Sequence, residues 1–376
     1  MKIGIEAQRI QRKKKHGMDI VAIEIIRQLQ KIDLENEYYI FVKAGEDKRV
    51  LSETPNFKVI ELPGKTYADW EQIQLPKAAK KYKLDLLHCT SNTAPIMGKT
   101  PLIVTVHDII YLEKLHFKQG TWYQKLGNIY RRWNVPLIIK KARRILTVSH
   151  FEEENIRKRF PTRSGDIYTV YNAASAHFRV IGDSALLNEA RKRYQLPENF
   201  LFFLGNTDPK KNVPNVLKAY AEYRKNNVNP LELVLPDLDK GYLNDLLEEI
   251  RDPDLHQHIH LTGYVPNSEL PYIYNLCKFF LYPSKRESFG IPILEAMQCG
   301  KAVITASTSS MPEIASNASL LVDPEDIAAI EKGIELLDKD DALREKLEKA
   351  GLERSAHFSW EQSARQVLLH YQEIPA

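Results

Sequence analysis

The stretch KFFLYPSKRESFGIPILEAMQCGKAVITAS, residues 278–307, shows the pattern from which the chain is built. An apolar run ends in a polar turn, a short helical segment follows, and a second apolar run closes the stretch. Gly290 permits a close approach of the backbone to a ligand, Pro292 suits the first turn of a helix, and Gly300 suits the position after its end. A strand, a helix and a further strand in this order indicate a parallel sheet.

The same alternation continues in both directions along the chain. In the first half we predict strands at KIGIEA, YYIFV, FKVIEL, LDLLHC, PLIVTV, RRILTVS and DIYTVY. In the second half we predict them at FLFFLGN, LELVLP, IHLTGYV, KFFLYPS, KAVITAS and ASLLVD. Apolar residues at helical spacing lie between them, as in residues 20–29, and Ser149 with Glu152 forms a capping-box pattern before another helix.

This alternation predicts an α/β protein with two Rossmann-like, doubly wound domains that face each other across a cleft. A length of 376 residues agrees with two domains. We expect an N-terminal Rossmann-like domain over 1–175 and a C-terminal Rossmann-like domain over 176–355. The final helix, within 356–376, is expected to pack back on the N-terminal domain. Ligands of such folds bind at the carboxyl ends of the strands.

Composition indicates an ordinary globular protein, with 43% hydrophobic and 27% charged residues. No apolar run has the length of a signal peptide or a bilayer span. The cysteines are three, at 89, 277 and 299, without a CxxC pair. A sparse, odd set argues against a disulfide framework or a zinc site and favours a reducing compartment, so we expect a cytoplasmic protein.

Charge is divided unevenly between the two halves of the chain. Residues 1–180 hold 32 Lys and Arg against 19 Asp and Glu, and residues 181–376 hold 21 against 30. A basic half is suited to an anionic partner, such as a membrane surface, a lipid phosphate or a phosphorylated acceptor. The alternative is that these charges cover solvated helix faces. No nucleic-acid-binding module accompanies the basic half, so we expect no nucleic acid.

Two carboxylates lie near the start of the helix that follows the strand KFFLYPS. Glu287 lies just before this helix, and Glu295 lies about one turn into it. The first turn of a helix offers unpaired N–H groups and a positive dipole end, which together favour a phosphate. Carboxylates accept hydrogen bonds from sugar and ribose hydroxyls. The alternative is a capping role for Glu287 and a solvated Glu295.

The segments around this pair resemble the retaining glycosyltransferases of family 4, also called group 1, which have the GT-B fold. Glu287 and Glu295 match the family's E-x7-E motif, and the likeness extends through SSMPEIASNASLLVDPED and HFSWEQSARQVLLHY. In the first half it covers WEQIQLP, DLLHCTSNTAP, TVHDIIYL and LTVSHFEEENI. These segments follow the family's order over nearly the whole chain.

The resemblance implies that the domain over 1–175 binds the acceptor and that the domain over 176–355 binds the nucleotide-sugar donor. It also implies specific roles for these residues. Glu287 is expected near the hydroxyls of the transferred sugar, and Glu295 is expected on the nucleotide ribose. The amides of Phe289 and Gly290, beside Ile291, would hold the distal phosphate as charge develops on the leaving diphosphate.

The segment LGNTDPKKNV supplies a lysine to the same expected site. Gly205 forms the glycine turn, Lys211 provides a compact charge for the diphosphate, and Asn212 follows it. At Asn206, where many relatives have arginine, the chain departs from the family, and Arg286 or Lys285 is the candidate that compensates. A solvated helix entry is the alternative for this lysine.

The first half adds a histidine and a basic loop. His107 follows the strand PLIVTV, and the family places a histidine here against the donor sugar, while Asp108 is expected to support the loop or the histidine tautomer. Residues 8–19 form a basic loop in which His16 and Gly17 bring the backbone near donor phosphates or acceptor. The alternative for its lysines is a solvated tip.

No nucleophilic carboxylate and no D-x-D motif dedicated to a divalent ion stand out, so the resemblance implies a front-face retaining mechanism without a metal. No cofactor is expected beyond the substrate, a nucleotide-sugar. WEQIQLP, SNTAP and HDIIYL are most similar to the mannosyltransferase-like branch, which favours GDP-mannose, with UDP-sugars as the alternative. The expected acceptor is a glycan or lipid-linked anionic molecule at the inner face of the membrane. An epimerase of the same fold and a non-catalytic binding partner also stay open, whereas the absence of G-x-G-x-x-G disfavours a dehydrogenase.

Overall fold

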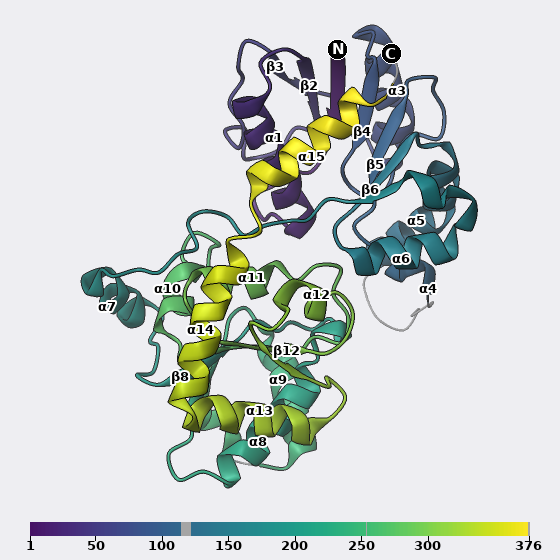
Figure 1. Ribbon diagram of the computed structural model, residues 1–376. Helices are drawn as coiled ribbons and strands as arrows, with labels where there is room; N and C mark the ends of the chain where they lie inside the picture. The colour runs from purple at the N-terminus through teal and green to yellow at the C-terminus, as the bar shows by residue number, and fades with distance from the viewer. Residues whose placement is uncertain (114–121, 253, 375–376) are drawn as a thin grey trace. The chain divides into compact units, whose positions relative to one another are not determined.

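The computed structural model describes residues 1–113, 122–252 and 254–374, and these residues divide into two compact units. Unit 1 comprises residues 1–172 together with the chain from Trp360 onward, and unit 2 comprises Ala173–Ser359. Each unit has its own sheet with helices packed against it (Figure 1). Within the described residues, no helix is long and apolar enough to cross a bilayer.

Unit 1 contains a seven-stranded parallel sheet in the order β3-β2-β1-β4-β5-β6-β7. Its strands are β1 Lys2–Glu6, β2 Glu37–Val42, β3 Phe57–Glu61, β4 Leu86–Cys89, β5 Leu102–Thr105, β6 Arg144–Thr147 and β7 Ile167–Thr169. Its helices are α1 Gly17–Ile32, α2 Tyr67–Asp69, α3 Leu75–Lys81, α4 Ile110–Glu113, α5 Trp122–Lys141, α6 His150–Arg159 and α15 Trp360–Gln372, with a π turn η1 at Trp70–Gln74 and a 3-10 turn η2 at Pro161–Asp166.

Unit 2 contains a six-stranded parallel sheet in the order β10-β9-β8-β11-β12-β13. Its strands are β8 Phe200–Phe203, β9 Glu232–Leu235, β10 Ile259–Leu261, β11 Phe280–Tyr282, β12 Val303–Ala306 and β13 Leu320–Val322. Its helices are α7 Ser184–Arg193, α8 Val213–Lys225, α9 Lys240–Ile250, α10 Leu270–Leu276, α11 Ile291–Gln298, α12 Met311–Ala315, α13 Ile327–Lys339 and α14 Asp341–Ser355, with 3-10 turns η3 at Pro209–Lys211 and η4 at Leu255–His258.

Both sheets have the Rossmann strand order, which confirms the predicted fold of each domain. In this order the chain leaves the first strand to one side and later returns to its other side. The reversal lies between β1 and β4 in unit 1 and between β8 and β11 in unit 2. Loops that follow the two strands diverge there, which opens space for a ligand at their carboxyl ends.

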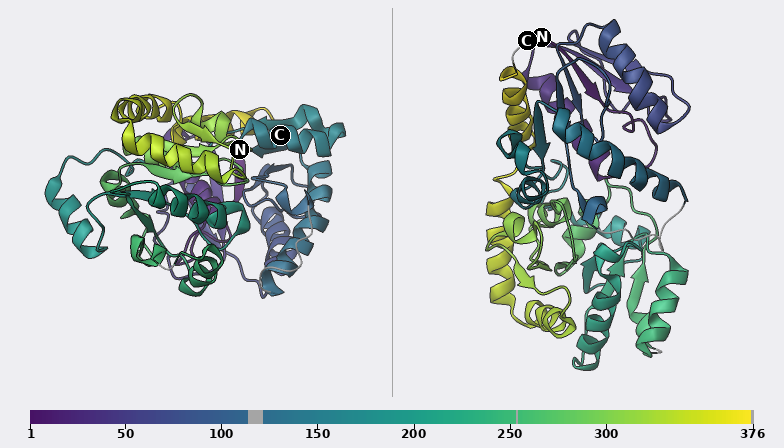
Figure 2. Two further views of the ribbon diagram at one scale, coloured as in Figure 1. Left: turned by 90° about the horizontal axis from the view of Figure 1, so that it is seen from below. Right: turned by 90° about the vertical axis from the view of Figure 1, so that its right-hand side faces the viewer.

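The helices of unit 1 cover both faces of its sheet. α15 packs beside α1 on one face, where the Tyr371 hydroxyl lies 2.6 Å from Nδ1 of His88 on β4. On the other face, α3, α5 and α6 share a core with the strands, and this core includes Trp70, Val135 and Ile156. The end of α15 and the start of β1 lie side by side in every view (Figures 1 and 2).

The predicted local signals have the expected geometry. Ser149 caps α6, because its hydroxyl accepts a hydrogen bond from the amide of Glu152 at 3.2 Å. Gly290 is the N-cap of α11 at φ 94°, and Gly300 follows its end at φ 69°. Both angles lie in the left-handed region that favours glycine. All three cysteines are free and buried.

Candidate functional site

In unit 2, three polar side chains meet at the point where the strand order reverses. Lys211 ends η3, in the loop after β8, and its ammonium donates to the Tyr282 hydroxyl at 2.5 Å and to Oε1 of Glu287 at 2.7 Å. Tyr282 is the last residue of β11, and its hydroxyl also lies 3.1 Å from Glu287 Oε1. We call Lys211, Tyr282 and Glu287 the triad.

Burial and charge set the ionisation state of Glu287. Burial opposes its ionisation, but the charges of Lys211 and Lys210, with hydrogen bonds from Lys211 and Tyr282, hold its pKa below the ordinary value. The carboxylate is therefore charged at neutral pH. An ammonium has three hydrogens, and the triad occupies two of those on Lys211, so this cation can also bind an anion.

The backbone at Glu287 is fixed by neighbouring hydroxyls. Its amide donates to Oγ of Ser309 at 3.1 Å, and its carbonyl accepts from Ser310 at 2.9 Å. Arg286 also donates to this carbonyl, at 3.2 Å. Lys285 ion-pairs with Glu325 at 2.8 Å, and its amide is bonded to the carbonyl of Lys210. The loops after β8 and β11 are thereby tied to each other.

Glu295 lies on α11, about one turn from the N-terminus, as predicted. It is 7% exposed, and one carboxylate oxygen accepts a hydrogen bond from Tyr274 at 3.1 Å. Burial raises its pKa to about 7, although the Tyr274 hydrogen bond and the charge of Lys211 act in the opposite direction. Lys211 thus influences both glutamates, so the structure brings the predicted E-x7-E pair and the lysine together.

The remaining predicted residues of unit 2 surround this cluster in different ways. Gly205 is buried, and a Cβ there would lie 2.8 Å from the Phe203 ring. Asn206 is exposed and accepts a hydrogen bond from the amide of Asp208 at 2.9 Å. Asn212 is fully buried, and its amide donates to the carbonyls of Pro283 and Pro324 at 3.0 and 2.7 Å. The Asn212 side chain therefore fastens the loops behind the site.

At the N-terminus of α11 the residues differ in exposure. Phe289 is buried against Phe358, with ring centroids 5.9 Å apart. Gly290 has no side chain to cap the helix, and Ile291 is half-buried at its first position. Since Pro292 has no N–H, the backbone donors here are few and belong to the residues next to Gly290.

In unit 1, His107 follows β5 and is 5% exposed. Its amide donates to Asn92 at 2.6 Å, and its Nε2 lies 2.8 Å from the carbonyl oxygen of Thr90. A carbonyl only accepts, so Nε2 carries the proton and Nδ1 has the free lone pair. Burial lowers the pKa of His107, which keeps the ring neutral. Asp108 accepts from the amide of Ile110 at 3.2 Å and so supports the loop.

The basic loop before α1 is exposed at residues 12–14 and 16–17. His16 is the N-cap of α1, and its amide donates to Asp19 at 3.0 Å. A Cβ at Gly17 would meet no atom within 4 Å, so the backbone there is open to solvent. Lys15 forms an ion pair with Asp47.

The WEQ triplet within WEQIQLP has a structural role in unit 1. Glu71 accepts hydrogen bonds from Thr93 and Tyr130, both at 2.5 Å. Gln72 donates to the carbonyl of Ala94 and accepts from the amide of Ile96, both at 2.9 Å. Burial raises the pKa of Glu71 to about 7. These contacts anchor the loop that carries the SNTAP segment.

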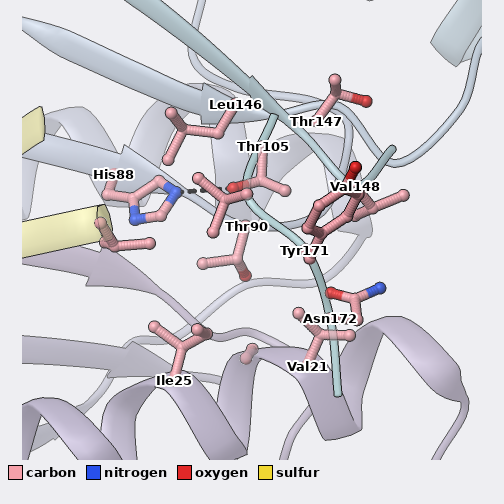
Figure 3. Close-up of a pocket in the computed structure, with 13 residues that line it drawn as sticks. Val21, Ile25, His88, Thr90, Thr105, Leu146, Thr147, Val148, Tyr171 and Asn172 are labelled. Carbon is pink, nitrogen blue, oxygen red and sulfur yellow. Dashed lines mark hydrogen bonds between the residues drawn. The ribbon is translucent and has the colours of Figure 1, made fainter. Parts of the chain in front are cut away.

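A cavity of about 30 Å³ lies between α1, α15 and the unit 1 sheet (Figure 3). Val21 and Ile25 of α1 line it, and the imidazole of His88 donates to or accepts from Thr105 at its edge, at 2.8 Å. This volume holds about one water molecule and is too small for a sugar.

Sequence reasoning missed Tyr282, Tyr274, Ser309 and Thr90. Tyr282 could have been found, because it ends the strand that leads directly to Glu287. Tyr274 and Ser309 come from other elements, and no spacing in the sequence indicates their contacts. Thr90 acts through its backbone carbonyl, which any residue type could supply.

Two family models match the chain. One is described as glycosyl transferases group 1 and matches residues 188–354, and the other is described as glycosyltransferase family 4 and matches residues 16–177. A relative from Escherichia coli, O-antigen chain mannosyltransferase B, is 33% identical over 271 residues, which cover 72% of this chain and 69% of the relative. The serotype-specific mannosyltransferase WbdA of Escherichia coli is 27% identical over 239 residues, 60% of this chain and 28% of the relative.

Solved structures show the same fold at low sequence identity. HepE of Anabaena, solved in complex with UDP and glucose, has a TM-score of 0.76 at 18% identity, and all of both chains is covered. WaaG, a glycosyltransferase involved in lipopolysaccharide biosynthesis, has a TM-score of 0.72 at 12% identity, covering 97% of this chain and 98% of WaaG.

Proposed function

The chain belongs to the group 1 glycosyltransferases, in their mannosyltransferase-like branch, and we propose that it transfers mannose from GDP-mannose to a lipid-linked glycan acceptor. The proposal includes retention of the anomeric configuration and a role in cell-envelope polysaccharide synthesis. The two relatives support mannose, since both are mannosyltransferases of Escherichia coli.

The observation that carries the proposal is the triad, with Glu295 beside it. Lys211 already balances one buried carboxylate and has a hydrogen left for a phosphate oxygen. We propose that this ammonium and the backbone amides at the N-terminus of α11 bind the donor diphosphate. We assign the sugar hydroxyls to Glu287 and the ribose hydroxyls to Glu295.

The proposed reaction begins when the bond between the sugar C1 and the diphosphate oxygen breaks. The bonding electrons go to that oxygen, and Lys211 stabilises the negative charge that develops there. The acceptor hydroxyl then attacks C1 from the same face, and its proton passes to the departing phosphate. This front-face route retains the configuration and requires no carboxylate nucleophile.

Glu287 is suited to position the sugar in this scheme. The ammonium and the phenol hold its carboxylate in place and keep it ionised, so it accepts a sugar hydroxyl without moving. The proposal assigns neutralisation of the diphosphate to protein groups and includes no metal cofactor. The expected result with a chelator is an unchanged transfer rate.

The site of action and the acceptor are also part of the proposal. We assign the enzyme to the cytoplasmic face of a membrane, where a lipid-linked acceptor is presented. The excess of Lys and Arg in residues 1–180 supports an anionic acceptor and a peripheral contact with lipid. UDP-sugar transfer, epimerisation and donor binding without catalysis are the competing outcomes.

A transfer assay with purified protein tests the proposal. Labelled GDP-mannose and UDP-glucose are offered separately with a lipid-linked glycan, and the anomeric configuration of the product is read by NMR. The expected product is an α-linked mannose from GDP-mannose, at least 100-fold reduced in Glu287→Gln. Transfer from UDP-glucose alone, donor epimerisation without acceptor, or binding without turnover would each overturn the proposal.

A further inference from the structure

A polar pocket, distinct from the small cavity beside α1, lies in unit 1 at the amino ends of β5 and β6. Its volume is about 450 Å³, within the range of ligand sites. The loop before β5, the end of α5 and the turn η2 enclose it. The charged side chains of its lining are Lys99, Lys140, Lys141, Arg143, Arg163 and Asp166. Five cations thus surround one carboxylate, and we call this site the basic pocket.

The cations of the basic pocket differ in how they are held. Lys141 donates to the carbonyls of Pro95 and Ile96 at 3.2 and 2.8 Å, and Arg163 ion-pairs with Asp166 at 3.2 Å. The remaining three, Lys99, Lys140 and Arg143, are exposed, and no described carboxylate pairs with them. Two cations therefore shape the pocket walls, and three are available to an anion.

An apolar stripe on α5 leads to this pocket. Ile129, Trp133 and Leu137 are 51%, 57% and 39% exposed and lie four residues apart, so they share one face of the helix. Lys140, one turn further, continues the same face. The opposite face, with Val135 and others, packs in the core of unit 1. The stripe therefore faces away from the core. α5 itself lies on the side of the sheet away from α1 and α15 (Figure 1).

An outward stripe of a tryptophan with aliphatic neighbours is unusual for a solvated helix. Burying one large apolar side chain stabilises by about 1.5–3 kcal/mol. The three exposed side chains of the stripe would therefore gain this stabilisation only by contact with an apolar partner. Met97, 73% exposed, directly precedes Gly98 and Lys99 of the pocket lining and is a further exposed apolar side chain. Apolar side chains beside unpaired cations are the composition of a helix at a lipid interface.

We propose that this face of unit 1 docks on an anionic membrane, with the stripe inserted among the acyl chains and a lipid phosphate in the basic pocket. The inference deepens the proposed function, because a lipid-linked acceptor requires an enzyme at the membrane surface. The charges favour lipid phosphates, and the apolar stripe favours a bilayer over an acidic protein or free phosphate. The pocket is separate from His107, since Pro101 precedes β5 and His107 follows it, and the four strand residues alone span roughly 13 Å.

Vesicle binding tests the docking. The protein is sedimented with vesicles of phosphatidylcholine alone or with 30% phosphatidylglycerol, and partition coefficients are measured. Binding is expected only with the anionic lipid. Each cation near an anionic surface contributes about a fivefold factor, so Lys140→Ala/Arg143→Ala should bind roughly 25-fold more weakly. The charge-matched control, Lys31→Ala/Lys349→Ala, removes two exposed cations elsewhere and should bind within about threefold of the unaltered protein.

Tryptophan quenching tests the orientation. Brominated acyl chains should quench fluorescence of the unaltered protein more than that of Trp133→Phe, while both bind equally. Trp133→Ser/Leu137→Ser should lose binding, and the apolar control Val228→Ser, at a residue 98% exposed in unit 2, should not. Thermal unfolding of each variant verifies its fold.

The outcomes separate this inference from the proposed function. Transfer to a short, water-soluble acceptor without vesicles should be unchanged in the pocket and stripe variants. If neither the unaltered protein nor any variant transfers sugar to this acceptor, the proposed function is rejected. Vesicle binding can still be measured in that case and tests the docking separately. Equal vesicle binding by the pocket variant and its control, or no binding by the unaltered protein, overturns the docking. Inorganic phosphate at 10 mM that abolishes vesicle binding would show a free-phosphate site and also overturn it.

Discussion

Replacing Lys211 separates its role in stability from its role in donor binding. Lys211→Met removes the charge and the two hydrogen bonds but keeps the length of the side chain. Glu287 then loses its ion pair in a site where its side chain is 11% exposed. Loss of one partner from a buried pair costs about 3–5 kcal/mol, and the partial exposure here places the expected loss near the lower figure.

The double variant Lys211→Met/Glu287→Gln gives the control. Removing both charges leaves no unpaired carboxylate, so most of the lost stability should return, to within about 1 kcal/mol of the unaltered protein. Thermal unfolding measures this, because 3 kcal/mol shifts the transition of a unit of this size by about 6–12 °C. The single variant should show that shift, and the double variant should not.

Donor affinity should behave differently from stability. A hydrogen bond to a charged group contributes about 1.5–3 kcal/mol, so both variants should bind GDP about 10- to 150-fold more weakly, by isothermal titration. If the double variant, whose stability is restored, binds GDP as tightly as the unaltered protein, Lys211 is only a structural partner of Glu287. The assignment of the diphosphate to this lysine is then wrong.

The remaining predictions concern pH, packing and a helix cap. The pKa of Glu295 is about 7 in the folded protein, and the ionised form accepts ribose hydroxyls, so GDP affinity should rise between pH 6 and 8 and lose this added dependence in Glu295→Gln. A flat profile in both proteins would contradict the ribose role. Gly205→Ala should destabilise by about 1–3 kcal/mol, because its Cβ would meet the Phe203 ring, whereas Gly182→Ala, with nothing within 4 Å, should change thermal stability little. Ser149→Ala should cost about 1 kcal/mol in a denaturant titration; no change would exclude its cap as a stabilising contact.

The strands were predictable because burial on both faces of a parallel sheet requires continuous apolar runs. The runs LIVT at β5 and FLFF at β8 are buried as expected, and the predicted positions of the seven and six strands are confirmed. Their order in the sheet is a different matter. β8 pairs with β11, and no local pattern specifies that these two become neighbours.

This order explains what sequence reasoning about the site achieved and missed. The approach of Lys211 to Glu287, 76 residues apart, depends on the pairing of β8 with β11, and the family motifs indicated it only because they carry that pairing implicitly. Side-chain packing determines which way the Tyr282 hydroxyl and the Asn212 amide point, and therefore which groups they contact. Alternation and spacing contain no information about such directions.

The central claim is that Lys211, Glu287 and Glu295 together bind the nucleotide-sugar. Thermal unfolding with GDP-mannose tests it most directly, in the unaltered protein and in Lys211→Met/Glu287→Gln/Glu295→Gln. A ligand at 100 times its dissociation constant stabilises the folded state by about 2.7 kcal/mol, so the unaltered protein should melt several degrees higher with donor. The triple variant should melt at the same temperature with and without donor. An equal rise in both proteins would place the donor elsewhere and contradict the account.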